Sequence, residues 1–508
     1  MTRRRPRRAD PAPPARRRRR LGLTPLALLA LAGWAAAGCS DPPTSGGDAA
    51  RTGDADGDGA VDLPDCPLDA LDQAGGPVEV DLWYGGLNGS SKIAMDDMAA
   101  AFNASQDAVV VNASNQGAAY EEVYRKFTSA AAAGTDQLPD MIYLEDTQLQ
   151  AMVDSGYVLP AQACMEAAGY DVTNLEPAVR SKYSVDDVLY PAYVNVSTPV
   201  LYYNKSHWQK AGLDPEDPPD TLDELYEQAK AIKDAGVSAK PFSFKATRWF
   251  YETWLTGIGD EIVNNNDGRD GLATEATFAS ADGEDLMAFL VKMNDEGLLN
   301  VFANTEGGID QYLALITQES SMLLETSTAS TTIRDALQGS ITAEQAGADF
   351  DPSVIDASVL VPGTGPYPGI EAPGRVFPSG GAFYILNTSE PARQAASWAF
   401  TEFMLQPENA KQWHLNGGYL PVVKAVEDEP DVEDFWQHDL AGVLLQPAAE
   451  QLADADPDQP GPLIGPYPDE TDQIEAAMEA ILLDGQDIAS TLATAQDNVT
   501  ESLERYAG

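Results

Sequence analysis

The stretch Val78-Glu-Val-Asp-Leu-Trp-Tyr84 decides the fold, because apolar side chains alternate along it as they do in a half-buried strand. The apolar residues that follow predict a helix, a second strand, a second helix and a third strand, in that order. They are Met98 and Phe102, residues 108–111, then Tyr120, Val123 and Phe127, and finally residues 138–143. Strands and helices alternating at this spacing imply right-handed crossovers and a parallel sheet.

The rest of the folded chain repeats this alternation less regularly. Residues 191–203 are typical of a strand, and residues 221–235 predict a helix that begins with a capping box of Thr221 and Glu224. Residues 471–506 predict a C-terminal helical region. About 430 folded residues exceed what one hydrophobic core comfortably serves, so we expect an α/β protein of two lobes.

The N-terminus is typical of a bacterial export signal. Ten of the first twenty residues are arginine, and residues 21–37 form an apolar stretch that is too short for a membrane span. Residues 36–39 resemble a lipobox, which predicts that residues 1–38 are removed and that Cys39 is lipidated. We therefore expect an exported protein anchored at the outer face of the cell membrane, or a periplasmic one. Ordinary signal cleavage, and export by the general or the twin-arginine route, stay open.

Without residues 1–38 the chain has 21 basic and 79 acidic residues, a formal net charge of −58. A surface this acidic repels nucleic acid and anionic lipid, so we expect neither as a partner. The same charge disfavours an anionic ligand unless the binding pocket is locally basic. It is equally explained by solubility alone.

Three cysteines remain in an exported chain. If Cys39 carries lipid, Cys66 and Cys164 are left as a pair in an oxidising compartment, which predicts a disulfide. The three histidines, His207, His414 and His438, have no metal-ligand spacing, so we do not expect a zinc site.

Residues 39–76 are rich in Asp, Gly and Pro and are interpreted as a tether between the membrane and the folded region. Oxygen ligands on nearly alternate residues around glycines suit calcium, and the stretch resembles an aspartate-rich calcium-binding repeat. The candidate ligands are Asp54, Asp56, Asp58, Asp62 and Asp65. A solvated acidic linker explains the same residues, so no cofactor is required.

Four motifs in order resemble the extracellular solute-binding proteins of family 1, which include the glycerol-3-phosphate and maltose binders. They are Asn195-Val-Ser-Thr-Pro-Val-Leu-Tyr-Tyr-Asn-Lys205, Glu319-Ser-Ser-Met-Leu-Leu-Glu-Thr-Ser327, Gly380-Gly-Ala-Phe383 and Gly418-Tyr-Leu-Pro-Val422. The resemblance runs from about Val78 to the C-terminus. It implies two α/β lobes, each with a mostly parallel sheet flanked by helices, joined by hinge strands. On this basis residues 78–192 and 382–424 form the N-lobe, and residues 193–381 and 425–508 form the C-lobe.

The same resemblance implies a monomeric binding protein that captures a sugar between the lobes and delivers it to the membrane subunits of an ABC importer. A sugar pocket needs aromatic side chains for its CH faces and hydrogen-bonding groups for its hydroxyls. The aromatic candidates are Trp83, Tyr120, Trp249, Tyr419 and Tyr467. The polar candidates are Glu145, Asp146, Ser197, Ser327 and the backbone at Gly381. Each of these residues also has an ordinary structural explanation, and Trp254 is assigned to the core.

Residues 461–468 contain no arginine, where the resemblance would place a phosphate-reading arginine in a glycerol-3-phosphate binder. We therefore expect a neutral mono- or oligosaccharide, with glycerol-3-phosphate or a glycerophosphodiester as the alternative. The chain lacks a Gly-x-Ser-x-Gly nucleophile motif and a phosphate-binding Gly-x-x-x-x-Gly-Lys loop, and abundant acidic residues make chance carboxylate pairs inevitable. We do not expect an enzyme. A secreted carbohydrate-active enzyme and a calcium-dependent surface module remain the alternatives of another class.

Overall fold

The computed structural model places most of the chain after the predicted tether. It describes residues 62–87, 89–305, 308–340, 359–372 and 374–508, which belong to one compact unit. The export signal, Cys39, Asp54, Asp56 and Asp58 lie outside the described residues. Asp62 and Asp65 lie within them and are exposed. Among the described helices, none combines the length and the apolar character needed to cross a membrane.

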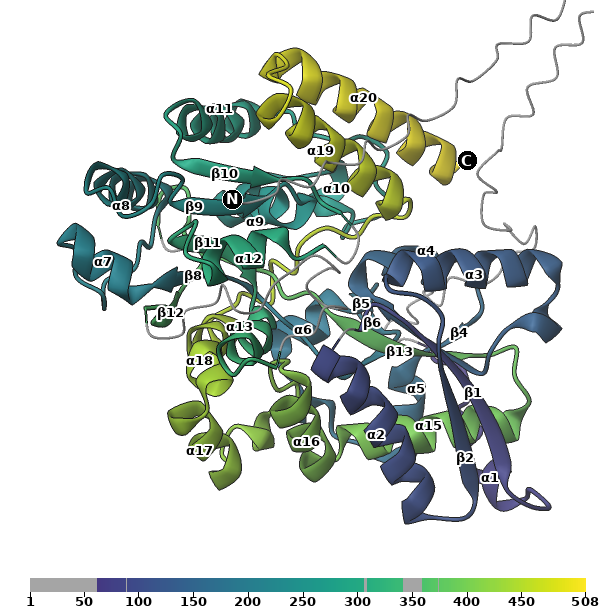
Figure 1. Cartoon of the computed structure of the whole chain (residues 1–508). Coiled ribbons are helices and arrows are strands. Elements are labelled where there is room, and N and C mark those ends of the chain that lie inside the picture. The colour runs from purple at the N-terminus through teal and green to yellow at the C-terminus, as the bar shows by residue number, and fades with distance from the viewer. Residues whose placement is uncertain (1–61, 88, 306–307, 341–358, 373) are drawn as a thin grey trace, which may run out of the picture. The chain divides into compact units, whose positions relative to one another are not determined.

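The first sheet contains the strands that the opening stretch predicts. Its strand order is β2-β1-β3-β13-β4, with β7 paired to β13 on the side (Figure 1). β1 runs parallel to β2 and β3, and β13 runs antiparallel to its neighbours. The bounds are β1 Val78–Tyr84, β2 Val109–Asn115, β3 Met141–Glu145, β4 Val158–Leu159, β7 Ala192–Tyr193 and β13 Gly381–Leu386.

Helices cover both faces of this sheet (Figure 1). α2, α15 and α16 pack together on one face, and α3 and α4 lie on the other. The predicted apolar residues Met98 and Phe102 of α2, and Val123 and Phe127 of α3, are all buried. The bounds are α2 Gly89–Ser105, α3 Tyr120–Ala133, α4 Leu149–Asp154, α5 Ala161–Ala168, α6 Pro177–Lys182, α15 Pro391–Leu405 and α16 Pro407–Gly417.

The second sheet has the strand order β10-β9-β11-β8-β12. β10, β9 and β11 are parallel, and β8 is antiparallel to both β11 and β12. The bounds are β8 Pro199–Asn204, β9 Phe242–Lys245, β10 Leu299–Phe302, β11 Met322–Thr326 and β12 Pro362–Gly365. Trp254 lies in the hydrophobic core beside this sheet, as the sequence predicts.

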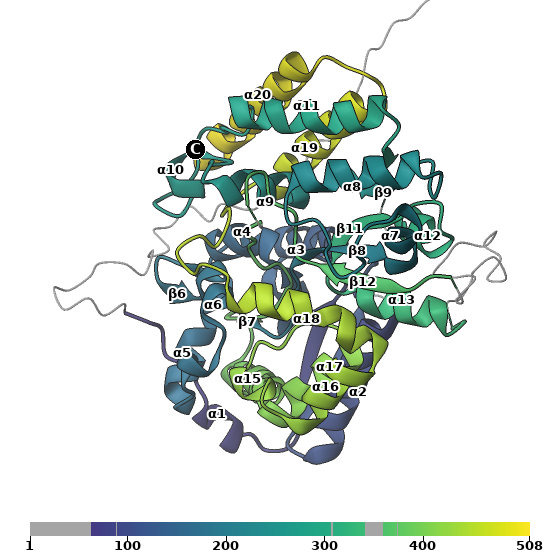
Figure 2. The ribbon, with the colours of Figure 1, turned by 90° about the vertical axis from the view of Figure 1, so that its left-hand side faces the viewer.

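We call the part of the unit built on the first sheet the first half, and the part built on the second sheet the second half. The helices of the second half include α11, α19 and α20, which lie side by side at one end of the unit (Figure 2). The bounds of this group are α7 Lys205–Ala211, α8 Leu222–Asp234, α9 Arg248–Ile258, α10 Asn264–Asp267, α11 Ala281–Asp295, α12 Asp310–Ile316, α13 Ala329–Leu337, α17 Pro430–His438, α18 Leu440–Ala453, α19 Tyr467–Leu482 and α20 Ile488–Ala507. Shorter elements are α1 Asp69–Asp72, β5 Ser184–Val185, β6 Val188–Leu189, and the 3-10 turns η1 Thr135–Gln137, η2 Asp146–Gln148, η3 Val172–Asn174 and η5 Lys424–Val426. The predicted capping box is present, since Thr221 Oγ1 accepts from the Glu224 N–H at 3.2 Å.

Both sheets are more mixed than the expected mostly parallel arrangement. β13 enters the first sheet from the second half of the unit, and β8 enters the second sheet from the first half. A chain that crosses from the other half arrives at the carboxyl edge of the parallel strands, so it must run antiparallel to them. Antiparallel bridges between Ser197 and Ser379, and between Val196 and Leu420, join the crossing segments.

The predicted disulfide joins Cys66 to Cys164, with their Cα atoms 5.0 Å apart. Cys66 lies just before α1, and Cys164 is buried in α5. The bond therefore fixes the start of the described region to the half of the unit that contains the first sheet.

Candidate functional site

A cavity of about 550 Å³ is lined by residues from both halves of the unit. From the first half, mainly the N-terminal ends of α2 and α3 contribute, with Gly86, Ser91, Ala118, Ala119, Glu121 and Arg125. From the second half come Lys245, Asn304, Thr305, Gly308, Ile309, Gln311, Tyr312, Thr328, Thr331 and Thr332, together with Pro468, Thr471, Asp472 and Glu475 of α19. Gly417 and Tyr419 complete the lining. Hydroxyl, amide and charged groups dominate this set.

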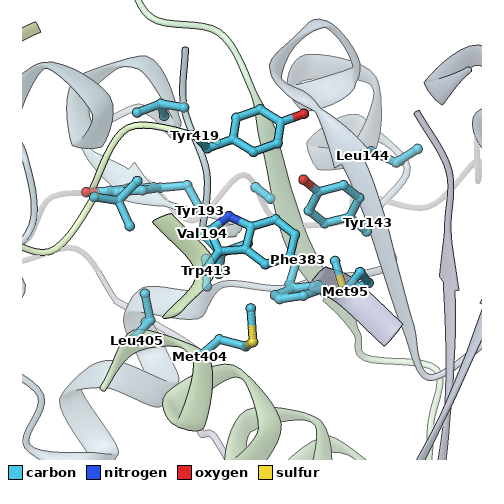
Figure 3. Close-up of a cluster of buried hydrophobic side chains, with 14 of the residues drawn as sticks. Met95, Tyr143, Leu144, Tyr193, Val194, Phe383, Met404, Leu405, Trp413 and Tyr419 are labelled. Atoms are coloured by element: carbon cyan, nitrogen blue, oxygen red, sulfur yellow. The ribbon is translucent and has the colours of Figure 1, made fainter. Parts of the chain in front are cut away.

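Tyr419 lines the cavity, whereas its neighbours Tyr143, which is buried, and Tyr120, which is half-buried, are not among the lining residues. Its ring is nearly parallel to that of Trp413, at 8°, with the ring centroids 6.1 Å apart. Tyr143 lies opposite, and Figure 3 shows the hydroxyls of Tyr419 and Tyr143 pointing toward one another. Tyr120 packs against Tyr143 with the ring centroids 5.9 Å apart. Burial raises the pKa of Tyr419 to about 12, against the lowering effect of side-chain hydrogen bonds with Tyr120 and Ser91, so its hydroxyl stays neutral.

Glu145 and Asp146 end the third strand, and the structure gives them different surroundings. Asp146 is buried in an ion pair with Lys182 at 3.1 Å, and it accepts from Ser379 Oγ at 2.7 Å. Glu145 accepts a 3.3 Å hydrogen bond from Thr147 Oγ1. Burial, followed by the nearby carboxylates of Asp146 and Glu121, raises the pKa of Glu145 to about 8. Glu145 is therefore protonated near neutral pH, whereas Asp146 holds crossing residues in place.

Glu475 forms a polar anchor on the wall contributed by the second half. Asn304 Nδ2 donates to both carboxylate oxygens of Glu475 at 2.8 Å, and Thr247 Oγ1 donates to one of them at 3.1 Å. The backbone N–H of Arg248, at the start of α9, also donates to Glu475. These contacts join the ends of β9 and β10 to α19.

Lys245 ends β9 and forms an ion pair with Glu325 at 3.3 Å. Gln311 Nε2 also donates to Glu325, at 3.1 Å. This lining cation is therefore already neutralised by a partner within the wall. Arg125 is the other cation of the lining, and its charge lowers the pKa of Asp472 in opposition to burial, which raises it overall.

Tyr467 lies in a buried charged cluster rather than among the lining residues. Its hydroxyl contacts both carboxylate oxygens of Glu252 at 3.1 Å, and the Arg248 guanidinium stacks over its ring at 4.6 Å. Arg248 also pairs with Glu252 at 2.7 Å. Burial and the charge of Glu252 raise the pKa of the neighbouring Glu470 well above its usual value.

The structure places the remaining sequence candidates in three different settings. Ser197 and Ser327 are buried in backbone contacts of the crossing segments, where the Ser327 N–H donates to Thr198. Gly381 packs against the Tyr143 ring so closely that an added Cβ would lie 2.1 Å from it. Trp249 is half-buried beside Phe250. Their predicted ligand roles stay predictions.

Trp83 lies next to the main cavity rather than in its lining. It faces a smaller, open hollow with Glu122, Arg125, Lys126 and Ser129 of α3. The reason is strand alternation, since Leu82 and Tyr84 point into the core and Trp83 points to the α3 side. Arg125 lines both hollows.

Sequence reasoning missed Arg125, Lys245, Asn304 and Glu475. Lys245 ends a strand and Asn304 closely follows one, so the rule that ligands bind at the carboxyl ends of strands would have found both. Arg125 and Glu475 lie within helices, and only tertiary packing brings them to the cavity.

A second cavity of about 570 Å³ contains none of the predicted site residues. Eight of its lining residues are acidic, including Asp186, Asp187, Asp260 and Asp458, and the lining also contains Arg269 and Arg375. Among the described residues, no three His, Cys, Asp or Glu side chains are grouped so that they could hold a metal ion.

Comparisons with known proteins agree with this geometry. Residues 97–439 match the family described as bacterial extracellular solute-binding protein. The sn-glycerol-3-phosphate-binding periplasmic protein UgpB of Shigella dysenteriae is 26% identical over 324 residues, covering 63% of this chain and 69% of the relative. The corresponding protein of Escherichia coli K12 is also 26% identical, over 325 residues, with the same coverage.

Two solved structures share the fold. The cyclic alpha-maltosyl-1,6-maltose binding protein of Arthrobacter globiformis has a TM-score of 0.63 at 22% identity, covering 85% of this chain and 100% of the other. UgpB of Mycobacterium tuberculosis, in complex with glycerophosphocholine, has a TM-score of 0.65 at 20% identity with the same coverage. The fold is therefore the two-lobed α/β architecture of solute-binding proteins.

Proposed function

The chain belongs to the family of bacterial extracellular solute-binding proteins, and we propose that it captures a neutral saccharide or polyol in the cavity between its lobes. It is a binding protein of the importer type rather than an enzyme. The observation that carries the choice of ligand is the charge balance of the cavity. Lys245 is already paired with Glu325, which leaves Arg125 as the lining cation that forms no ion pair within the described residues, in a lining that also contains the acidic Glu121 and Asp472.

A phosphate would need charge-assisted donors that are free to contact it. A saccharide needs hydroxyl, amide and carboxyl partners beside an aromatic surface. Hydroxyl and amide groups for a saccharide are offered by Thr305, Thr328, Thr331 and Gln311. An aromatic surface is offered by Tyr312 and Tyr419. The cavity lining therefore suits a neutral polyhydroxyl ligand better than a phosphate.

Glycerol-3-phosphate or a glycerophosphodiester is the second candidate. The curated relatives quoted above are named as sn-glycerol-3-phosphate binders, and one structural neighbour was solved with glycerophosphocholine. Arg125 favours this alternative as a donor to a phosphate. The net acidity of its surroundings opposes it.

Lobe closure over the ligand would give an importer a state to recognise. We propose the lobe boundaries predicted above, residues 78–192 with 382–424 and residues 193–381 with 425–508. The two sheets and the crossing segments at Ser197 and Ser379 support them. Delivery to ABC permease subunits, anchoring through Cys39 and a monomeric state complete the proposal. Membership of an extracellular family supports the exported location.

A thermal-shift panel tests the ligand class, because a molecule that binds only the native state raises Tm. The probes are maltose, D-tagatose, ribitol, sn-glycerol-3-phosphate and glycerophosphocholine. We expect a neutral member to raise Tm by several degrees and sn-glycerol-3-phosphate to leave it unchanged. The reverse ranking would establish the phosphate alternative.

Two variants locate the binding surface. Tyr419→Ala removes an aromatic side chain from the cavity lining and should abolish most of the ligand-induced shift. Trp83→Ala alters only the neighbouring hollow in this structure, although the sequence predicts that Trp83 contacts the sugar. Loss of binding in Trp83→Ala, with Tyr419→Ala unaffected, would move the site to that hollow.

A further inference from the structure

His414 is fully buried in α16 and contacts two different segments with its two ring nitrogens. The Nδ1 atom lies 2.5 Å from the carbonyl oxygen of Tyr419. On the opposite side of the ring, the indole N–H of Trp436 in α17 donates to Nε2 at 3.1 Å. The ring is further enclosed by edge-to-face contacts with Phe435 and Trp436.

These contacts determine which nitrogen of His414 carries the proton. An indole nitrogen can only donate and a carbonyl oxygen can only accept. Nε2 must therefore be unprotonated, and Nδ1 must carry the hydrogen that it donates to Tyr419. Burial lowers the pKa of His414 to about 4, which keeps the ring neutral at ordinary pH.

The carbonyl that His414 holds belongs to the tyrosine of the cavity wall. Tyr419 follows Gly418, whose φ of +76° turns the chain out of α16. The next residue, Leu420, donates its N–H to Val196 in the crossing segment. His414 and Val196 thus bind the C=O and the N–H of the peptide group that joins Tyr419 to Leu420, while the Trp413 ring stacks on the Tyr419 ring.

We propose that His414, protonated on Nδ1, is a positioning residue that fixes Tyr419 in the wall of the ligand cavity. The role in ligand binding rests on the proposed function, but the positioning itself does not. His414 is not among the residues that line the cavity, so it acts on a ligand only through Tyr419.

Two substitutions of similar size separate the two contacts of His414. In His414→Asn, the side-chain amide reaches the place of Nδ1 and can still donate to the Tyr419 carbonyl. In His414→Gln, the longer side chain carries its polar end to the place of Nε2, so the donor to Tyr419 is lost. Both variants lose ring packing, and urea unfolding should show a similar loss of stability for both.

His207 supplies a matched control. It is also buried, lies 2.7 Å from Ser321 Oγ, and has its pKa lowered to about 4 by burial. His207 does not line the cavity and lies in α7 of the second half. His207→Gln should therefore lower stability without changing the environment of Tyr419.

The first readout needs no ligand. In protein labelled with 3-fluorotyrosine, the ¹⁹F resonance of Tyr419 is assigned by its absence in Tyr419→Phe. We expect this resonance to shift or broaden in His414→Gln and to stay near its wild-type position in His414→Asn and His207→Gln. An unchanged Tyr419 resonance in His414→Gln, or equal changes in the Asn and Gln variants, would overturn the proposal.

The second readout is calorimetric titration with maltose. We expect binding about tenfold weaker in His414→Gln and near wild type in His414→Asn. Failure of maltose, D-tagatose and ribitol alike to bind the wild-type protein would count against the proposed ligand class, while the ¹⁹F result would still decide the positioning role. Equal maltose affinity in wild type and His414→Gln would overturn the role of His414 in ligand binding.

Discussion

Glu145 illustrates how a single half-buried carboxyl group links stability to pH. Its folded-state pKa of about 8 lies above the ordinary value of 4.5, so the folded protein binds a proton that the unfolded chain releases. The free energy of unfolding therefore falls as pH rises through this window. Glu470 acts in the same direction, whereas His207 and His414 titrate below their usual pKa of 6.5 and act in the opposite direction.

Between pH 6.5 and 8 the unfolded chain releases the last protons of the two histidines, and their opposing effect fades by about pH 7.5, so the carboxyl groups dominate the slope. We expect the unfolding free energy to fall by up to about 2 kcal/mol over this range and the Glu145→Gln variant to lose much of that fall. Urea titrations at several pH values measure it. Parallel pH profiles for wild type and variant would show that Glu145 ionises normally in the folded protein.

Which individual side chains line the cavity was the feature of the site that the sequence predicted least well. Tyr419 could be placed at the cavity because it lies in a motif, and the structure does put it in the lining. Ser197 and Ser327 were also selected from motifs, and Asp146 was selected because it follows a strand, but the three residues are engaged in an ion pair or backbone contacts. A sequence motif does not tell a side chain that contacts ligand from one that holds the crossing segments together.

At the scale of elements, β2 forms the free edge of the first sheet. The amide of Asn103 in α2 covers part of this edge, since Nδ2 donates to the Val111 carbonyl at 2.9 Å and Oδ1 accepts from the Val111 N–H at 2.8 Å. An uncovered edge strand offers backbone groups to other chains. Asn103 thus supplies hydrogen-bond partners to the Val111 backbone, on the side of β2 where the described residues contain no neighbouring strand.

Asn103→Ala should lower the free energy of unfolding by about 1–3 kcal/mol, because two backbone groups lose their partners. Urea unfolding measures the loss, and light scattering on warming should show earlier aggregation. Asn112→Ala is the control, because Asn112 lies on the same strand and is exposed. Equal losses in the two variants would mean that the amide does not protect the edge.

The elements themselves were largely predictable. The alternation of apolar residues predicted β1, and the helical spacing of Met98 and Phe102 predicted α2. Each pattern arises because one face of the element is buried. The antiparallel strands were not predicted, since strand direction depends on which half of the unit the chain comes from. Local periodicity contains no information about that origin.

At the scale of the whole molecule, a few crossing segments of the chain connect the two sheets. The Ser197–Ser379 bridge and the Asp146–Lys182 pair lie where these segments meet. Buried, paired groups hold this region together, and the ligand cavity and the acidic second cavity both have walls from the two halves. Relative movement of the halves should therefore change both cavities.

We expect small-angle X-ray scattering to show a smaller radius of gyration once a stabilising saccharide from the panel is bound. Hinge closure of two domains around a ligand makes the molecule more compact, with displacements that can exceed about 2 Å. Tyr419→Ala with the same saccharide is the control and should scatter like the free protein. An identical profile with and without ligand would contradict closure.

The Cys66–Cys164 bond has a mechanical consequence for whatever precedes it in the chain. The disulfide transmits a force applied to the segment before Cys66 to α5, and therefore to the half built on the first sheet. The other half receives no such load from that end. In a protein held at its N-terminus, the half that contains the first sheet would therefore stay fixed to the attachment point. The other half would be free to move without pulling on the attached segment.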